Sequence, residues 1–188
     1  MGITSEKSIY KKNINNYQSN INFISYIFCV LSVFGSLLLL IGLMLTGVFS
    51  KLKWSNILGL ALYFAVTLIV SSIIYFLTVR KNRDNPTVTK IFKYVLVLGS
   101  YANYLGIVKN VPYAEAWGTI FFSVSLSALY LEFSTLAYSA FLCTGVSVIS
   151  YFTQQTYVPQ GNVLSELILR GLSISFGFSG AMLTIMYS

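Results

Sequence analysis

The chain has 188 residues, of which 56% are hydrophobic, 16% are aromatic and 9% are charged, and it contains no histidine. Soluble domains carry about 25% charged residues, and a chain of this length cannot bury so much apolar surface without leaving large exposed patches. The composition therefore excludes an ordinary soluble domain and predicts an integral membrane protein whose main partner is the lipid bilayer.

The first 22 residues are polar and rich in asparagine and lysine. Such a composition predicts a short disordered tail over residues 1–22, and the alternative is a helix lying in the membrane interface. The apolar run that follows is much longer than the ~7 to 15 residues of a secretory signal core, so we expect it to be retained as an anchor.

Long apolar runs fill most of the remaining chain. An uncharged run of about 20 residues crosses the ~30 Å hydrocarbon core as an α-helix. The third run is short and contains Lys93, and only Glu132 separates the fourth run from the fifth. We therefore predict an all-α, six-helix transmembrane bundle over residues 23–188, with helices at 23–49, 54–79, 91–108, 112–131, 133–153 and 167–187.

Basic residues are distributed unevenly over the connections between these runs. Lysine and arginine favour the cytoplasmic side of a membrane protein. With the N-terminus inside, that side receives Lys7, Lys11, Lys12, Arg80, Lys81, Arg83, Lys90 and Lys93, and the outside receives Lys51, Lys53 and Lys109. We predict a multi-pass protein of the cell membrane with both termini in the cytoplasm, and this placement of charge does not indicate a nucleic-acid partner.

Two ionisable residues near the outer ends of predicted helices form the main candidate site. Glu115 begins the fourth helix and Arg170 begins the sixth, and ionisable groups in membrane helices usually face a protein interior or a cavity. If the two helices are neighbours, these residues could line an outward-opening pocket for a small external molecule. The remaining predicted lining residues are Asn103, Tyr104, Tyr113 and Trp117.

A simpler interpretation explains the same two residues without a ligand. Glu115 follows Pro112 in a first helical turn, where a carboxylate is favoured by the helix dipole. Arg170 lies four residues after Glu166, the spacing of an ordinary surface pair. On similar grounds Glu132, in the turn between two helices, is expected to be a solvated loop residue.

Small residues recur every four positions along the last two helices. Ser173, Gly177 and Ala181 lie in the sixth helix, and Ser139, Cys143 and Ser147 lie in the fifth. This spacing lets membrane helices approach closely, so the pattern predicts helix packing. The two cysteines, Cys29 and Cys143, lie inside apolar runs and are interpreted as small hydrophobic residues.

Catalytic motifs are not recognisable. Without histidine, histidine-dependent triads and histidine-ligated metal or haem sites are excluded. Asp84 is the only aspartate, which excludes a paired-aspartate intramembrane protease, and there is no glycine-rich phosphate loop. We therefore expect no enzyme activity, no cofactor and no metal.

The segment "PYAEAWGTIFFSVSLSALYLEFSTLAYSAFL", residues 112–142, resembles the six-helix N-terminal membrane segment of methyl-accepting chemotaxis proteins and related membrane sensors of Gram-positive anaerobes. The resemblance implies a sensory input module that relays an outer-side stimulus to a cytoplasmic output domain. The sequence stops at "AMLTIMYS" without a basic tail, so we expect such an output domain to follow in a longer protein.

Two other function classes stay open. The first is a small transport protein, such as the substrate-binding membrane subunit of a vitamin importer. Its characteristic alanines spaced by three are missing, because the first apolar run contains no alanine. The second is a membrane anchor that dimerises an output domain, with a homodimer as its assembled form.

Overall fold

The structure, a computed structural model, describes the backbone of residues 2–80, 86–112, 114–153 and 163–187, and the side chains of residues 16–80, 87, 90–112, 116–152 and 168–186. Every regular element in these ranges is helical. The elements are α1 (Gly2–Leu45), α2 (Trp54–Tyr75) with the π turn η1 (Phe76–Arg80), α3 (Pro86–Asn110), the 3₁₀ segment η2 (Ala114–Thr119), α4 (Ile120–Ala128), α5 (Phe133–Thr153) and α6 (Val163–Tyr187).

Five of the described helices are long and apolar enough to cross a membrane: Asn16–Leu45, Trp54–Arg80, Lys90–Asn110, Phe133–Phe152 and Ile168–Met186. Many of their large apolar side chains are exposed, including Phe141, Phe152 and Phe176. A helix that is apolar on all sides fits a lipid environment. The fold is therefore that of a helical membrane protein, and the short third run with Lys93 forms one of the long helices.

The predicted fourth helix, residues 112–131, is not one continuous α-helix. Its first part is η2, its second part is the nine-residue α4, and its last residues form a turn in which Leu131 has φ 49°. At the usual rises of the two helix types, η2 and α4 together extend about 25 Å, somewhat less than the ~30 Å core. Hydropathy predicted this apolar run correctly, but it could not predict the change from 3₁₀ to α-helix within the run.

The predicted disordered tail is also wrong, because α1 begins at Gly2. The helix continues past the apolar run, and its polar residues Gln18, Ser19 and Asn22 are buried. A nucleated helix extends at little cost, and these polar side chains find a protein interior rather than water. The predicted 167–187 helix likewise begins earlier, at Val163.

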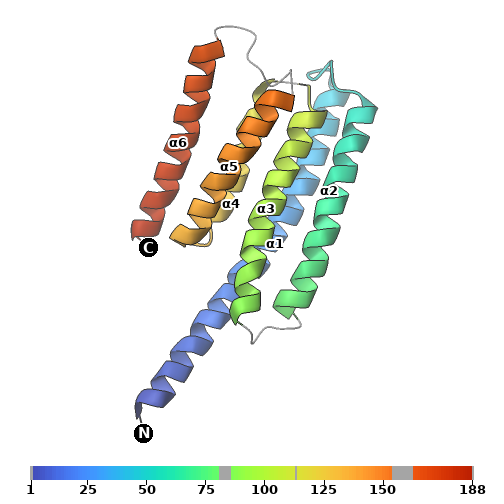
Figure 1. The fold of residues 1–188 in the computed structure, drawn as a ribbon. Helices are drawn as coiled ribbons and strands as arrows, with labels where there is room; N and C mark the ends of the chain where they lie inside the picture. Colours follow the sequence, from blue (N-terminus) through green and yellow to red (C-terminus); the bar gives the residue numbers. More distant parts are fainter. Residues whose placement is uncertain (1, 81–85, 113, 154–162, 188) are drawn as a thin grey trace.

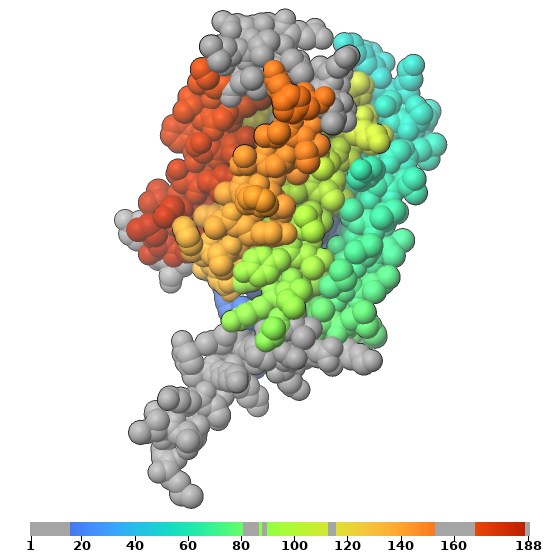
Figure 2. Space-filling view, viewed as in Figure 1, coloured from blue at the N-terminus to red at the C-terminus, as the bar shows by residue number. Residues whose placement is uncertain are grey.

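Helix α3 occupies the centre of the bundle and contacts α1, α2, α4 and α5, whereas α6 lies at one edge and packs on α4 and α5 (Figure 1). The space-filling view shows the coloured part of α6, residues 168–186, along one side of the molecule (Figure 2). The described N-terminal end of α1 and C-terminal end of α6 lie at the same end of the bundle (Figure 1). We call this end the inner end and the opposite end, where α1 and α2 are connected, the outer end.

Glycine allows close packing at the interface between α2 and α3. A Cβ atom on Gly106 would lie 2.9 Å from Cδ1 and 3.0 Å from Cγ of Tyr63. Gly177 of α6 is similarly close to Phe121 of α4, since its Cβ would lie 3.0 Å from that ring. The predicted small-residue face of α6, with Ser173 and Ala181 half-buried beside Gly177, is thus turned toward α4 at Gly177.

We predict that Gly106→Val lowers the unfolding free energy of the detergent-solubilised protein by about 1 to 3 kcal/mol, because overpacking forces Tyr63 and the α2 backbone to move. Gly35→Val is the matched control, since a Cβ at Gly35 meets nothing within 4 Å. Equilibrium unfolding of the two variants measures the difference. Equal losses in both would show that only helix propensity had changed and that the α2–α3 contact contributes nothing.

Candidate functional site

Glu132 lies at the start of α5, where its backbone carbonyl accepts hydrogen bonds from the N–H groups of Thr135 and Leu136, both at 3.2 Å. It is therefore the N-cap of α5, and its carboxylate lies at the positive end of the helix dipole. Leu131, with positive φ, ends the preceding helix through a hydrogen bond from its N–H to the Ala128 carbonyl. This local geometry turns the Glu132 side chain toward α3 and α1.

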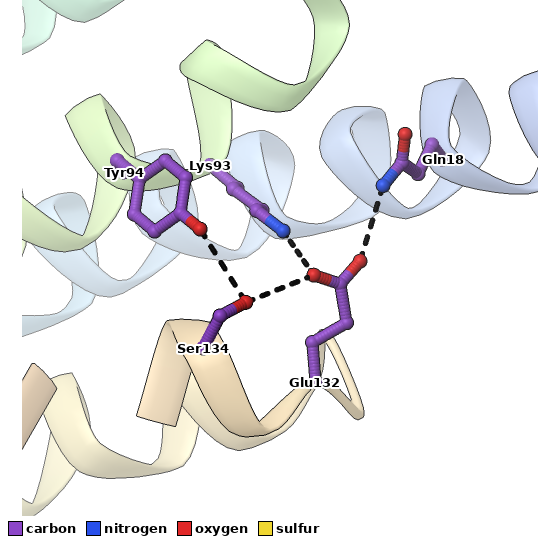
Figure 3. A network of polar contacts seen from close by, with 5 residues as sticks. All are labelled: Gln18, Lys93, Tyr94, Glu132 and Ser134. Atoms are coloured by element: carbon purple, nitrogen blue, oxygen red, sulfur yellow. Dashed lines mark hydrogen bonds and ion pairs between the residues drawn. The ribbon is translucent and has the colours of Figure 1, made fainter. Parts of the chain in front are cut away.

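The carboxylate of Glu132 connects three parts of the bundle (Figure 3). Its Oε2 forms an ion pair with Nζ of Lys93 on α3. Its Oε1 accepts a 3.1 Å hydrogen bond from Nε2 of Gln18 on α1. Ser134 donates to Oε2 at 3.4 Å, and Tyr94 donates to Ser134 at the same distance; both contacts are long and weak. We call Gln18, Lys93 and Glu132 the inner network.

Lys93 is the reason that this network matters energetically. Its side chain is 3% exposed, whereas that of Glu132 is 36% exposed. Removing a lysine ammonium from water costs several kcal/mol unless an anion and hydrogen bonds replace the solvent. The Lys93 ammonium also lies 5.0 Å from the centre of the Tyr94 ring, which adds a cation–π contact.

The expectation that Glu132 is a solvated loop residue is wrong, since its carboxylate is the ion-pair partner of a buried lysine. The sequence contained a signal for this pair. Lys93 interrupts an apolar run, a position that requires an anion, and Glu132 is the single acidic residue in the turn between two later runs. What the sequence could not supply was the turn geometry that brings the two together.

The pKa of Glu132 reflects opposing influences. Partial burial raises the pKa of this carboxyl, but the hydrogen bond and positive charge of Lys93, together with the hydrogen bonds from Gln18 and Ser134, outweigh burial and hold the pKa below its ordinary value. The carboxylate is therefore ionised at neutral pH.

A second polar feature lies farther along the bundle, where α1, α2, α3 and the η2–α4 segment meet. A cavity of about 210 Å³ opens between these elements. Its polar wall residues are Ser32, Ser36, Ser100, Asn103, Tyr104 and Thr119, and its other wall residues are Val33, Phe64, Ile107, Gly118 and Phe122. We call this space the head chamber.

Hydrogen bonds within the protein orient most of these polar groups. The hydroxyls of Ser32, Ser100 and Thr119 donate to the carbonyls of Phe28, Val97 and Ala116 at 2.7 to 2.8 Å. Asn103 accepts through Oδ1 from the hydroxyl of Thr67 on α2. These bonds use the hydroxyl hydrogens but leave the hydroxyl lone pairs able to accept hydrogen bonds. The Asn103 amide N–H groups remain as donors on the cavity wall.

The predicted outer pocket is divided by the structure. Asn103 and Tyr104 line the head chamber, but Arg170 lines a different cavity of about 280 Å³ between α5 and α6, with Ser147, Tyr151 and Phe152 among its walls. Trp117 lies beneath Arg170, whose guanidinium carbon is 5.5 Å from the ring centre. The side chains of Tyr113, Glu115 and Glu166 lie outside the described residues.

Arg170 is 4% exposed, so it is not the surface residue that the simpler interpretation predicts. The serines of the head chamber were missed by sequence reasoning, because serine is frequent in membrane helices and single hydroxyls carry no pattern. Ser32 and Ser36 do lie one turn apart on α1, but only the fold brings them opposite Ser100 and Asn103.

Within the described ranges, no group of three or more histidine, cysteine, aspartate or glutamate side chains could hold a metal ion. Comparisons with models of protein families, with curated proteins and with solved structures give no match to this chain.

We predict that Glu132→Gln destabilises the protein by about 2 kcal/mol, because Lys93 stays buried without the anion that compensates its removal from water. The value is below that of a fully buried pair because Glu132 is 36% exposed. The double variant with Lys93→Met removes both charges and should regain most of the loss. Equilibrium unfolding of the single and double variants tests this, and a double variant no better than Glu132→Gln would contradict it.

Acid should weaken the protein through the same residue. Since the pKa of Glu132 is lowered in the folded state, its stabilisation is complete above the ordinary glutamate pKa of about 4.3 and is lost as pH falls through the lower folded value. Melting temperatures between pH 7 and pH 3 should fall more steeply for wild type than for Glu132→Gln. Parallel curves would show that other carboxylates control the acid response.

Proposed function

We propose that the chain is a membrane-embedded sensory input module that binds a small molecule in the head chamber and passes a change in helix arrangement to its inner end. The observation that carries this proposal is the meeting of four separate elements around one partly polar cavity. A molecule that fits this space contacts α1, α2, α3 and η2 at once. It therefore favours whichever arrangement of these elements complements it best.

The position of α3 supports the coupling of this site to the inner end. Ser100 and Asn103 line the cavity, and Lys93 lies seven residues before Ser100 on the same helix, a rise of about 10 Å. A displacement of α3 that accommodates a ligand also displaces Lys93 relative to Glu132. From the α4–α5 turn the change reaches α6, which packs on both α4 and α5.

The full proposal includes features that the resemblance implies. We propose six membrane crossings, namely the five long helices and the η2–α4 segment, with both termini in the cytoplasm. The output domain would be a chemotaxis-type signalling domain following α6. Two observations support this topology. The start of α1 and the end of α6 lie at the same end of the bundle (Figure 1), and the basic residues are concentrated on the predicted cytoplasmic side.

Transport is the second candidate, favoured by one observation. The head chamber lies near the middle of the long α1, α2 and α3 spans and beside the interrupted helix formed by η2 and α4. Transporter sites commonly lie near the membrane midplane beside interrupted helices. Uptake of a stabilising compound into liposomes containing the protein would favour transport, and binding without flux would favour sensing.

The experiment is a thermal-stability screen of small molecules on the protein in phospholipid nanodiscs. At a ligand concentration 100 times Kd, binding adds about 2.7 kcal/mol, enough to raise the midpoint by several degrees. Asn103→Ala and Ser100→Leu should weaken the effect at least tenfold in apparent Kd. Ser175→Leu is the matched control, because Ser175 is exposed on α6 and bonds only its own helix at Gly171.

Sensing further requires that the ligand changes the helix arrangement. In a variant without native cysteines, spin labels at Lys90 and Thr184, both exposed, report the distance between the inner parts of α3 and α6. We expect a shifted distance distribution with ligand. Binding without any shift would favour the anchor interpretation, and loss of binding in Arg170→Gln but not in Asn103→Ala would move the site to the cavity between α5 and α6.

A further inference from the structure

A second cavity lies beside the head chamber, toward the outer end of the bundle. It measures about 200 Å³ and is walled by Leu39, Leu40, Leu43, Phe49, Val111 and Ala116, together with Ser36, Ile107 and Thr119. The last three residues also line the head chamber. The two spaces therefore adjoin each other between α1, α3 and η2, and we call the second one the tail chamber.

The two chambers differ in chemistry. The head chamber has six polar wall residues, whereas the tail chamber is walled by leucine, valine, phenylalanine and alanine except where the two meet. None of the described residues lining either chamber is charged. An ionised ligand would therefore lose its hydration without gaining a counter-charge from these walls.

The hydrogen-bonding groups of the head chamber define what a ligand must carry. The Asn103 amide offers N–H donors, since its oxygen accepts from Thr67. Ser32, Ser100 and Thr119 offer lone pairs, because their hydrogens bond backbone carbonyls. A complementary ligand group must both accept and donate, as a hydroxyl or a primary amide does.

We propose that the two chambers bind one neutral amphiphile, a medium-chain aliphatic alcohol or amide. Its polar group lies beside Asn103 and Ser100, and its hydrocarbon chain lies in the tail chamber. This inference rests on the proposed small-molecule function and specifies its ligand class. Each chamber is larger than the roughly 150 Å³ apolar cavity that binds benzene, which is enough volume for a chain of several carbons.

The surroundings of the site favour a ligand that arrives from the lipid. Phe122, a wall residue of the head chamber, stacks on Phe28 of α1 with 5.3 Å between ring centres. Phe28 is 42% exposed and Leu39 of the tail chamber is 64% exposed, both on the membrane-spanning part of α1. The walls of the site thus border the bilayer, where neutral amphiphiles concentrate.

Photolabelling with 3-azioctanol tests the proposal on the whole chain in phospholipid nanodiscs, with adducts located by mass spectrometry. We expect labelling concentrated in residues 32–49 and 100–122. Excess 1-octanol or octanamide should reduce it at least tenfold, and octanoate at the same concentration and neutral pH should not. Labelling that octanoate reduces equally would overturn the neutral class.

Matched alanine variants separate the site from general lipid exposure. Ala116→Leu fills the tail chamber and should reduce labelling of both segments at least fivefold. Ala137→Leu, at an exposed position on α5, should leave it unchanged. The proposed site would be overturned if exposed residues of α6, such as Phe176, were labelled as strongly as the two chamber segments and if both variants were labelled equally.

Failure of this inference is distinguishable from failure of the proposed function. A water-soluble compound that stabilises wild type but not Ser100→Leu, with azioctanol adducts only on lipid-facing residues, would overturn the amphiphile and retain the small-molecule function. If no compound stabilises the protein and azioctanol labels no specific site, both the amphiphile and the small-molecule function are overturned.

Discussion

The buried ammonium of Lys93 constrains the inner half of this bundle. A lysine that is 3% exposed inside an apolar helix needs an anion at contact distance, and Glu132 supplies it. For the carboxylate to reach Lys93, the chain must turn after Ala128 and start α5 at Phe133, which the left-handed Leu131 and the N-cap role of Glu132 achieve. The shortness of α4 is thus linked to the position of one charge.

The short α4 has a consequence at its other end. The segment before α4 is a 3₁₀ helix over Ala114–Thr119, whose longer rise per residue extends farther than an α-helix of the same number of residues. This segment contains Gly118, which lines the head chamber and has open space where a Cβ would be. A regular helix with a larger side chain there would fill part of the chamber. The inner ion pair and the cavity are therefore related through the same short helix.

Long apolar runs made the five long helices predictable, including the third run despite Lys93. The predicted packing face of α6 depended only on residue spacing, and Gly177 does lie against α4. The η2–α4 break was not predictable, because hydropathy is the same for α and 3₁₀ turns. The division of the predicted pocket had a similar cause, since the sequence places Asn103 and Arg170 in the outer parts of their helices but cannot show that they line different cavities.

Polar contacts explain why α3 is the central helix. Lipid is as apolar as the helix surfaces, so hydrogen bonds and close packing select helix neighbours in a membrane. From α3, Lys93 contacts the α4–α5 turn, Tyr101 bonds Ser139 of α5 at 2.8 Å, and Asn103 bonds Thr67 of α2. At about 0.6 kcal/mol each, the neutral bonds position neighbours without fixing them rigidly.

The outer half of α1 is held differently, through apolar contacts of residues such as Val33 and Leu40 with α2 and with Val111 and Ala116. Apolar contacts can slide, because neither partner leaves an unpaired polar group behind. Both chambers lie along this part of α1 and face the polar-bonded α3. Under the proposed function, a ligand placed between these helices would displace α1 and α3 relative to each other, and the apolar contacts of α1 oppose that displacement less than polar bonds would.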